Sequence, residues 1–449
     1  MSRLLRERWR AGVWVGGLGA VVLAGCATAP GTPGSGKLAV REYPLGPAYA
    51  STEVNTTIFR LQALASDEKY EYATYYDPAG KVVVARRPLD GAVWDKRTQD
   101  FSGNVKDAHN DVVLGLGPEG TLHLSYDHHD QPLHYRCTNG AGDWAAFGAP
   151  EKMSGQFERR VTYPTFVSAP SGELWFFYRD GQSGNGRLCL ERYDAAAKAW
   201  QAVAMPLLEG AGQCSPYWWR PEIGEDGVIN VAWCWRDTPN AETNHDICYV
   251  RSRDGGKTWE NSAGKELATP ITPGADVVVE KIPPGQNLIN TCALATDAQG
   301  RPHISYYRND ANGVPQYYHL WFDGQKWSAQ QVSRRTQAFS LGGSGTLEIP
   351  ISRPEIAVSR SGTVYLITRD KEFGNGARLY MAPPPYTEWT AMDMVAGSLG
   401  DWEPEYDMQR WRRDGVLDLF VLPSSQGNHE RVTGEGPQTA RVVEIAGLK

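Results

Sequence analysis

Histidine is concentrated in one short part of the chain. The stretch Asp107–Arg136 holds five of the nine histidines. Two apolar runs of strand length, Val112–Leu116 and Leu122–Tyr126, are joined there by the turn-forming sequence Gly-Pro-Glu-Gly, which predicts a β-hairpin. His109 precedes the first run and His129 follows the second. Because the start of one strand and the end of the next lie at the same edge of an antiparallel pair, we expect these two histidines to face each other.

Aromatic and basic side chains occupy the equivalent positions in the next two units of the chain. Residues that enter a first strand, or leave a second strand, should share the edge with the two histidines. Histidine, tyrosine and arginine with flanking tryptophans are a set suited to sugar binding and acid–base chemistry. The candidate catalytic residues are His109, His129, Tyr163 and Arg179, and the candidate substrate-binding residues are Asn110, His128, Tyr217, Trp218 and Arg236.

These residue types fit β-elimination from a uronic acid better than hydrolysis. Glycosidases normally need two paired carboxylates, and none of the nearby acids, Asp107, Asp127 and Asp130, has a clear partner across the edge. Arg179 could neutralise the uronate carboxylate and stabilise the enolate-like charge that develops as the C5 proton leaves. A neutral His109 or a tyrosine could remove that proton, and a tyrosine hydroxyl could protonate the departing O4 oxygen.

Each candidate also has a purely structural interpretation. Tyr163 could cap a strand, and Arg179 could form a surface salt bridge. His123 and His303 share one repeat position, three residues after a turn glycine, which favours packing. The two histidines at the predicted edge have no histidine counterpart in other units, and this favours a functional role for them.

An internal repeat supplies the strands that would hold these residues. Each unit has an apolar strand, a glycine turn, two further strands and a turn that closes on tryptophan. Ser252–Trp259 fits the Asp-box turn, which is typical of β-propellers. With partial copies at both ends there are seven units, and these predict an all-β, seven-bladed propeller as a single domain. The closing tryptophans are Trp94, Trp144, Trp200, Trp259, Trp327 and Trp389.

Composition supports this fold class. The chain has 16 Trp, 21 Tyr, 48 Gly and 29 Pro, and aromatic residues favour strands while glycine and proline supply turns. The net charge is −7 and the acidic surplus is spread along the sequence, which argues against a nucleic-acid partner. We expect a monomer without an organic cofactor.

The N-terminal residues have the pattern of a targeting signal. Four arginines precede an apolar segment that ends in Leu-Ala-Gly-Cys26, and this resembles a bacterial lipoprotein signal. We expect residues 1–25 to be removed, residues 26–50 to be a lipidated cysteine and a flexible tether, and residues 51–449 to be the propeller. The lipid would anchor the protein to a membrane of the cell envelope, with the outer membrane expected because Asp is absent at position 27. A plain secretory signal with a chance cysteine is the alternative.

Several segments together resemble a known family. DAHNDVVLG, LHLSYDHHDQPLHYR, VTYPTF and FFYRDGQSGNG look like the bacterial neuraminidase repeat (BNR-4) propellers, which include ulvan lyases of polysaccharide lyase families 24 and 25. The resemblance implies cleavage between a 3-sulfated rhamnose and a uronic acid by elimination. It matches His109 and Tyr163 to the catalytic pair, Arg179 to the carboxylate neutraliser, His129 to a second active-site histidine and Tyr217 to a substrate contact.

Two other functions remain open at the level of sequence. Some relatives are glycosidases or exo-acting lyases that act on rhamnose–glucuronic acid from the opposite face of the propeller. A non-catalytic, surface-anchored propeller that binds an acidic polysaccharide is the other alternative.

Four residues could form a structural zinc site. Cys234, His245 and Cys248 flank one loop, and Cys292 enters a first strand at the same predicted edge. Four such ligands suit tetrahedral zinc, and members of the resembled family carry a structural zinc near this place. A Cys234–Cys248 disulfide or buried free thiols are the competing interpretations.

Overall fold

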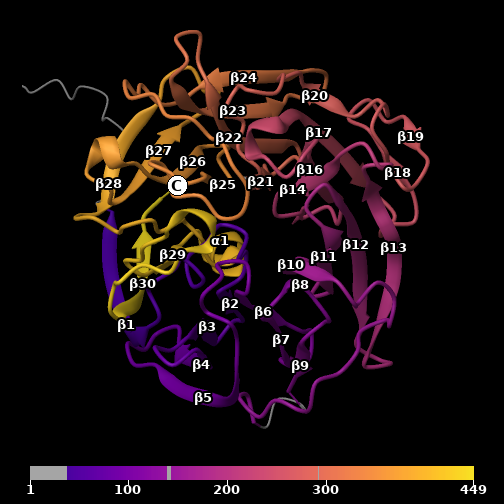
Figure 1. Ribbon diagram of the computed structural model, residues 1–449. Helices are drawn as coiled ribbons and strands as arrows, with labels where there is room; N and C mark the ends of the chain where they lie inside the picture. Colours follow the sequence, from indigo (N-terminus) through magenta and orange to yellow (C-terminus); the bar gives the residue numbers. More distant parts are fainter. Residues whose placement is uncertain (1–37, 139–142, 292, 449) are drawn as a thin grey trace, which may run out of the picture. The chain divides into compact units, whose positions relative to one another are not determined.

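The computed structural model describes residues 38–138, 143–291 and 293–448. These residues form one compact unit that is almost entirely β-structure, with thirty strands and one short α-helix, α1 (Met408–Asp414), in the described ranges. The strands pair into seven antiparallel sheets, which follow one another in sequence order around a ring (Figure 1). The predicted single-domain, all-β propeller is therefore confirmed.

The sheets are as follows, in chain order. The first contains β2 (Leu64–Ser66), β3 (Tyr70–Tyr76), β4 (Lys81–Pro88) and β5 (Asp95–Ser102), the second β6 (Val112–Leu116), β7 (Leu122–Tyr126) and β9 (Tyr135–Cys137), and the third β10 (Val161–Ser168), β11 (Leu174–Gln182), β12 (Asn185–Asp194) and β13 (Ala199–Glu209) with β8 (His129–Gln131). The fourth contains β14 (Ser215–Trp218), β15 (Glu222–Ile223), β16 (Ile229–Arg236), β17 (Asn244–Ser252), β18 (Trp259–Glu260), β19 (Glu266–Leu267) and β20 (Val278–Glu280). The fifth contains β21 (Ala293–Thr296), β22 (Pro302–Asn309), β23 (Pro315–Phe322) and β24 (Trp327–Gln331), the sixth β25 (Glu355–Val358), β26 (Val364–Arg369), β27 (Ala377–Ala382) and β28 (Thr390–Val395), and the last β29 (Leu417–Val421), β30 (Gln438–Ala446) and β1 (Ala39–Ala48). Short 3-10 turns lie at Ala241–Thr243, Lys371–Phe373 and Asn428–Glu430.

The units are less regular than the repeat predicted. Only three of the seven sheets in the described ranges have four strands. In the last sheet the innermost strand is reduced to a single bridge between Tyr406 and Leu419. β8 leaves the second unit and pairs with β10 of the third, where His129 lies opposite Thr162. This exchange carries one histidine of the second unit into contact with the third.

The ring is closed by the N-terminal strand. β1 pairs along its length with β30, from Ala39 opposite Ala446 to Ala48 opposite Gln438. Leu45 of this strand is completely buried. Residues 39–48 therefore belong to the propeller, and their assignment to the flexible tether was wrong. The predicted signal segment and Cys26 lie outside the described residues.

The Asp-box turn has the predicted geometry. Oδ1 of Asp254 accepts hydrogen bonds from the backbone N–H groups of Lys257 and Thr258, at 3.1 and 2.9 Å. Trp259 follows and is buried. The turn is thus a local hydrogen-bonded unit that places a large aromatic side chain into the core.

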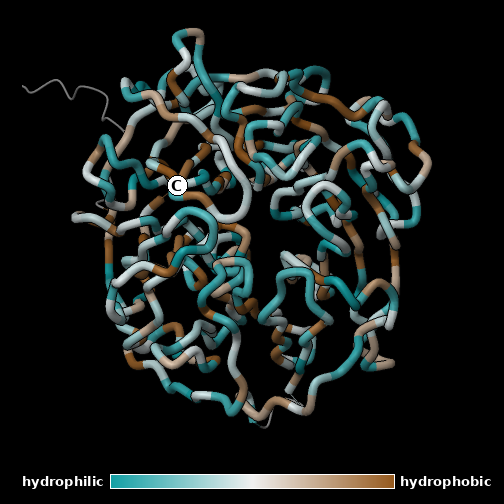
Figure 2. The backbone as a smooth tube through the Cα atoms, viewed as in Figure 1, coloured by the Kyte–Doolittle hydropathy of each residue, from teal (hydrophilic) through white to brown (hydrophobic). Residues whose placement is uncertain are grey.

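Charged residues of the inner strands pair with one another inside the ring. The sequence Arg-Pro-Glu occurs at residues 220–222 and 353–355, in both places at the entry to a first strand. Its arginine is buried there and meets a carboxylate of another unit. Figure 2 shows the hydropathy of the chain, with hydrophobic segments in the strands and hydrophilic segments in many outer loops. The buried pairs are Arg220–Glu355, Arg353–Glu403 and Arg60–Glu405.

No helix among the described residues is long and apolar enough to cross a membrane.

Candidate active site

The predicted histidine pair is present. The rings of His109 and His129 are stacked, with centroids 4.0 Å apart and planes 13° from parallel. Nδ1 of each ring lies within hydrogen-bonding distance of one carboxylate, that of Asp107. Phe59 stacks on the other face of His109, with centroids 4.9 Å apart. The hairpin therefore brings the two imidazoles together as its strand pattern predicted.

A β-bulge presents Tyr163 at the same place. The register of β10 against β11 shifts between Thr162 and Thr165. Tyr163, inside the bulge, has a φ of 57°, a left-handed backbone that bulky residues rarely adopt. Bulges re-aim side chains and, like strained backbone, cluster at functional sites. The Tyr163 ring lies 5.7 Å from that of His109 and 4.7 Å from the guanidinium carbon of Arg179.

These side chains share a pocket of about 80 Å³. All four predicted catalytic residues line it, and so do two of the predicted binding residues, Tyr217 and Arg236. The Tyr217 hydroxyl is 2.8 Å from that of Ser183, which also lines the pocket. The residues that the repeat placed at one edge thus converge on a single small cavity. The four are His109, His129, Tyr163 and Arg179.

Three predicted binding residues do not line this pocket. His128 is buried, and its Nε2 accepts a hydrogen bond from the backbone N–H of His134. Trp218 packs edge-on against Tyr163 from the core, and the Asn110 amide donates to a backbone carbonyl. Neighbouring residues in extended chain point to opposite sides. For this reason His128 and Trp218 face away when the adjacent residues face the pocket.

Part of the pocket wall comes from segments that the sequence analysis did not single out. Phe59 lies before the first sheet, and Thr346 lies in the long connection between β24 and β25. Glu430, in the last unit, approaches Nδ1 of His109 to 3.7 Å and accepts a hydrogen bond from the backbone N–H of Thr346. Arg353 also lines the pocket and is ion-paired with Glu403. Among these additional pocket residues, Arg353 alone belongs to a recurring sequence pattern, Arg-Pro-Glu, which could have drawn attention to it.

Two arginines of the pocket are buried without a carboxylate partner. Arg179 donates from Nε to the carbonyl of Gly181 at 3.1 Å and from Nη2 to the Thr162 hydroxyl at 3.2 Å. Arg236 donates to the carbonyl of Pro239. Neither guanidinium lies within ion-pair distance of a carboxylate in the described ranges, so the surface salt bridge considered for Arg179 is wrong. A hydrogen bond from Arg160 lowers the pKa of Asp130, and the charge of Arg179 contributes to this at longer range. A buried charge is costly unless it is paired. The pocket is therefore electrostatically prepared for an anion.

Burial sets the protonation states in the pocket. Burial and the neighbouring His129 lower the pKa of His109 below its usual value. Burial raises the pKa of Tyr163 to about 12, although the cation of Arg179 opposes this. Burial would also raise the pKa of Asp107, but the hydrogen bonds of His109 and His129 hold it well below its usual range. At neutral pH the site therefore offers a neutral imidazole, a protonated phenol and an ionised carboxylate.

A family model described as the BNR repeat-containing family matches residues 70–335. The chain belongs to this family. An ulvan lyase from Alteromonas sp. (strain LOR) is 23% identical over 416 residues, which cover 79% of each sequence. The crystal structure of the polysaccharide lyase Uly1 has a TM-score of 0.65 at 16% identity, covering 86% of this chain and 90% of that one. A PL25 ulvan lyase bound to -[GlcA(1-4)Rha3S]- has a TM-score of 0.64 at 13% identity, covering 89% and 95%. The two solved structures share the fold of this chain.

Asp107, His109 and His129 also form a group that could be considered for metal binding. The stacking of the rings argues against a shared ion. Lone pairs of imidazole lie in the ring plane, and two nearly parallel rings 4.0 Å apart cannot both direct theirs at one ion. Hydrogen bonding to Asp107 already accounts for both Nδ1 atoms.

The predicted zinc ligands do not converge in the described part of the chain. Cys234 and Cys248 are buried free thiols, and the strand register pairs Cys248 with Trp233, so the disulfide is also wrong. Both ring nitrogens of His245 lie 3.1 Å from carboxylates, those of Asp246 and Asp237. The ligand atoms of the three residues do not all lie within 4.8 Å of one another. Cys292 lies outside the described residues.

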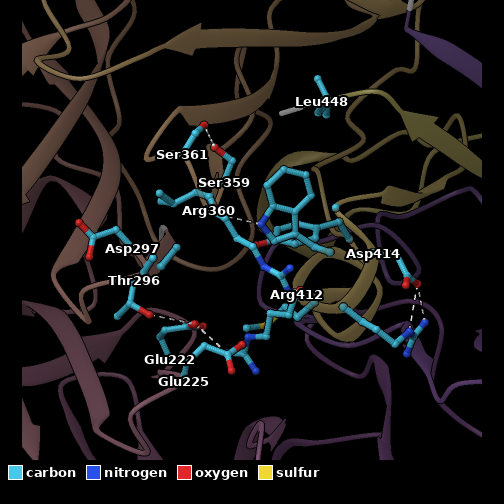
Figure 3. A pocket seen from close by; sticks show the side chains of 18 residues that line it. Glu222, Glu225, Thr296, Asp297, Ser359, Arg360, Ser361, Arg412, Asp414 and Leu448 are labelled. Atoms are coloured by element: carbon cyan, nitrogen blue, oxygen red, sulfur yellow. Dashed lines mark hydrogen bonds and ion pairs between the residues drawn. The ribbon is translucent and has the colours of Figure 1, made fainter. Parts of the chain in front are cut away.

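A larger pocket, of about 640 Å³, lies at the other end of the inner strands (Figure 3). It is lined by α1 and by turns between first and second strands, whereas the histidine pocket lies where first strands begin. Two of its carboxylates interact with basic side chains. Glu222 is ion-paired with Arg412 at 2.7 Å, and hydrogen bonds from His303 and Arg301 hold the pKa of Asp297 at about 2 despite burial.

Proposed function

We propose that the protein is a polysaccharide lyase that cleaves rhamnose–uronic acid linkages of an acidic, sulfated polysaccharide by β-elimination. The observation that carries this proposal is the pair of buried guanidiniums without carboxylate partners, Arg179 and Arg236, beside an imidazole pair and a buried phenol. An anionic sugar supplies the missing negative charge. The similarity to an ulvan lyase supports the choice of sugar.

Each of three residues has a separate role in the proposed elimination. Arg179 holds the uronate carboxylate and stabilises the negative charge that builds on it in the transition state. A neutral imidazole, that of His109, takes the C5 proton at Nε2. The C5–H electron pair forms the C4=C5 double bond, and the C4–O4 bond breaks. The Tyr163 hydroxyl gives its proton to O4 of the leaving sugar. Transfer of the proton from the imidazolium back to the phenolate, directly or through water, restores the starting state.

The assignment of base and acid follows from the protonation states. A general base must be unprotonated at the working pH, and a general acid must be protonated. The lowered pKa of His109 keeps its ring neutral, and the pKa of about 12 keeps the Tyr163 phenol protonated. His109 is therefore the base and Tyr163 the acid in our proposal. Arg236, over the ring of Tyr217, is placed to bind a second anionic group such as a sulfate.

Removing either group should stop the reaction. We expect His109→Ala and Tyr163→Phe each to abolish the ultraviolet absorbance of the unsaturated uronate on digestion of acidic polysaccharides, because each lacks one of the two proton-transfer groups. Their circular dichroism and melting temperatures should stay close to those of the parent. His134→Ala, which changes a histidine of the same hairpin outside the pocket, is the matched control and should retain activity. Full activity in both pocket variants would refute the proposal.

The same assay separates the alternatives. A hydrolase would release sugar without the absorbance, and a binding protein would give neither signal. A hydrolase at the opposite pocket needs one carboxyl group with a raised pKa and one ionised carboxylate. Asp297, whose pKa is about 2, does not supply the raised member.

We also propose that the protein acts at the cell envelope through a lipid on Cys26. The basis is the sequence of residues 3–26 alone. Growth with a radiolabelled fatty acid should label the parent chain in the membrane fraction but not Cys26→Ala. Equal labelling of the parent chain and of Cys26→Ala would refute the proposed lipid anchor.

A further inference from the structure

Asp107 uses both carboxylate oxygens on the stacked histidines. Its Oδ1 lies 2.9 Å from Nδ1 of His109, and its Oδ2 lies 2.6 Å from Nδ1 of His129. The backbone N–H of His109 also donates to Oδ1, at 2.9 Å, which fixes the carboxylate relative to that ring. Both rings line the pocket, whereas Asp107 does not. Any effect of Asp107 on a substrate must therefore pass through the two imidazoles.

The carboxylate determines where the imidazole protons are. An ionised carboxylate only accepts hydrogen bonds, so each Nδ1 that bonds to it must carry the hydrogen. In a neutral imidazole the other nitrogen, Nε2, then holds a lone pair. Because the rings are nearly parallel and both turn Nδ1 toward Asp107, their Nε2 atoms are on the side away from it. His109 and His129 thus have the same tautomer.

We propose that Asp107 is a positioning residue that holds both histidines in the Nε2-basic tautomer and makes them one basic unit. This inference rests on the proposed function for its kinetic consequence, but not for the tautomers themselves. The unit works as a base because either Nε2 can accept a proton while Asp107 balances the resulting positive charge.

The unit holds at most one extra proton. Two imidazolium rings stacked at 4.0 Å would repel each other, and Asp107 supplies only one negative charge. From other elements, His109 is faced by Glu430 at 3.7 Å, the Thr346 hydroxyl at 3.5 Å and the uncharged Tyr163 ring. Glu430 is the one additional anion among these, and it also accepts the Thr346 backbone N–H. A proton taken from the substrate must therefore leave before the next turnover.

Asp107→Asn tests this role. The amide has one accepting oxygen and one donating NH₂ group. The oxygen belongs on the His109 side, because the backbone N–H of His109 needs an acceptor there. The NH₂ group then faces Nδ1 of His129, which must become an acceptor, and this ring loses its Nε2 lone pair. His109 keeps its basic Nε2 but loses the carboxylate that balances its positive charge, so we expect kcat to fall by about 10²-fold, the lower end of the range for general-base catalysis, with little change in KM. The acidic limb of the pH profile should move to lower pH because His109 loses its nearest anion.

The tautomers can be read independently of activity. In parent protein labelled with ¹⁵N-histidine, imidazole NMR spectra at mildly basic pH should show both rings with hydrogen on Nδ1. In Asp107→Asn only His129 should switch to hydrogen on Nε2. Single His→Gln variants assign the signals among the nine histidines.

Asp127→Asn is the matched control. Asp127 belongs to the same hairpin, has a positive φ that Asn tolerates, and accepts the Asn104 backbone N–H through an oxygen that Asn retains. It should leave kcat, pH profile and tautomers unchanged. Hydrogen on Nε2 of either pocket histidine in the parent protein would overturn the inference, and so would an unchanged kcat in a folded Asp107→Asn. If the parent releases no unsaturated uronate, the proposed function fails while the NMR measurement still decides the role of Asp107.

Discussion

At the scale of single residues, the pocket holds two kinds of buried arginine that differ in one respect. Arg353 is ion-paired with Glu403, and Arg179 has only neutral acceptors. A buried cation with no anion lowers stability, and it persists where function needs it. On the proposed function, Arg353 therefore belongs to the scaffold and Arg179 binds the anionic ligand.

Replacement by methionine should separate these two roles. Arg179→Met removes an uncompensated charge, so the melting temperature should stay equal or rise while kcat/KM falls by about 10²- to 10³-fold, as expected for loss of one electrostatic contact to the transition state. Arg353→Met leaves Glu403 buried without its partner and should cost about 3–5 kcal/mol of unfolding free energy. Thermal denaturation measures the stability of the two variants, and the uronate absorbance assay measures their activity. A large loss of stability in Arg179→Met would show that its charge is compensated within the protein.

The pH dependence of activity follows from the same site. The pKa of His109 is lowered below 6.5, chiefly by burial, so its basic form persists below that pH. The acidic limb of kcat/KM should therefore have its midpoint below pH 6.5, and ionisation of Tyr163, with a pKa of about 12, should not limit the rate near neutrality. His129→Gln removes a neighbour that lowers the pKa of His109, and the limb should move to higher pH. A limb that moves to lower pH would contradict this account.

At the scale of strands and turns, the sequence predicted those site residues that lie at equivalent strand ends of the repeat. His109 and His129 were located by the two ends of one hairpin, and Tyr163 and Arg179 by the equivalent ends of the next. The errors at His128 and Trp218 came from side-chain alternation, which a one-residue uncertainty in strand phase reverses. Phe59, Thr346 and Glu430 come from irregular segments of other units, and no local pattern connects them to the histidines.

The Asp-box turn gives a prediction at this scale. Hydrogen bonds from the backbone and hydroxyl of Thr258 lower the pKa of Asp254, so its contribution to stability is present above the usual aspartate pKa and is lost as the pH falls through the lowered value. Asp254→Ala should lower the melting temperature at neutral pH without changing kcat or KM, because the turn does not line the pocket. Asp254→Asn keeps one accepting oxygen, so its melting temperature should lie between those of the parent protein and Asp254→Ala. Loss of activity in a folded Asp254→Ala would contradict the purely structural role.

At the scale of the whole molecule, the propeller class was predictable because tryptophans, turn glycines and strand pattern recur together. The position of its N-terminal boundary was not. Most side chains of residues 39–48 are exposed, as suits an outermost strand, and the two prolines and one glycine of this segment resemble a tether in sequence. Pairing with β30, some four hundred residues later, gives the segment its structure.

Truncation tests this closure. A chain that begins at residue 38 should have the same melting temperature as a chain that begins at residue 27. A chain that begins at residue 50 lacks β1, which exposes the edge of β30 and removes the buried side chain of Leu45. We expect a clearly lower melting temperature or aggregation for this shorter chain, measured by differential scanning fluorimetry and light scattering. Equal melting curves for the two chains would show that the N-terminal strand is dispensable.

The pairing of β1 with β30 also constrains the order of events during biosynthesis. The first strand of the ring emerges from the ribosome long before its partner, and it cannot pair until β30 has been made. Such distant contacts are slow to form because a long loop must close first. Closure of the ring is thus a late step of folding, which follows the formation of strands that are near one another in sequence.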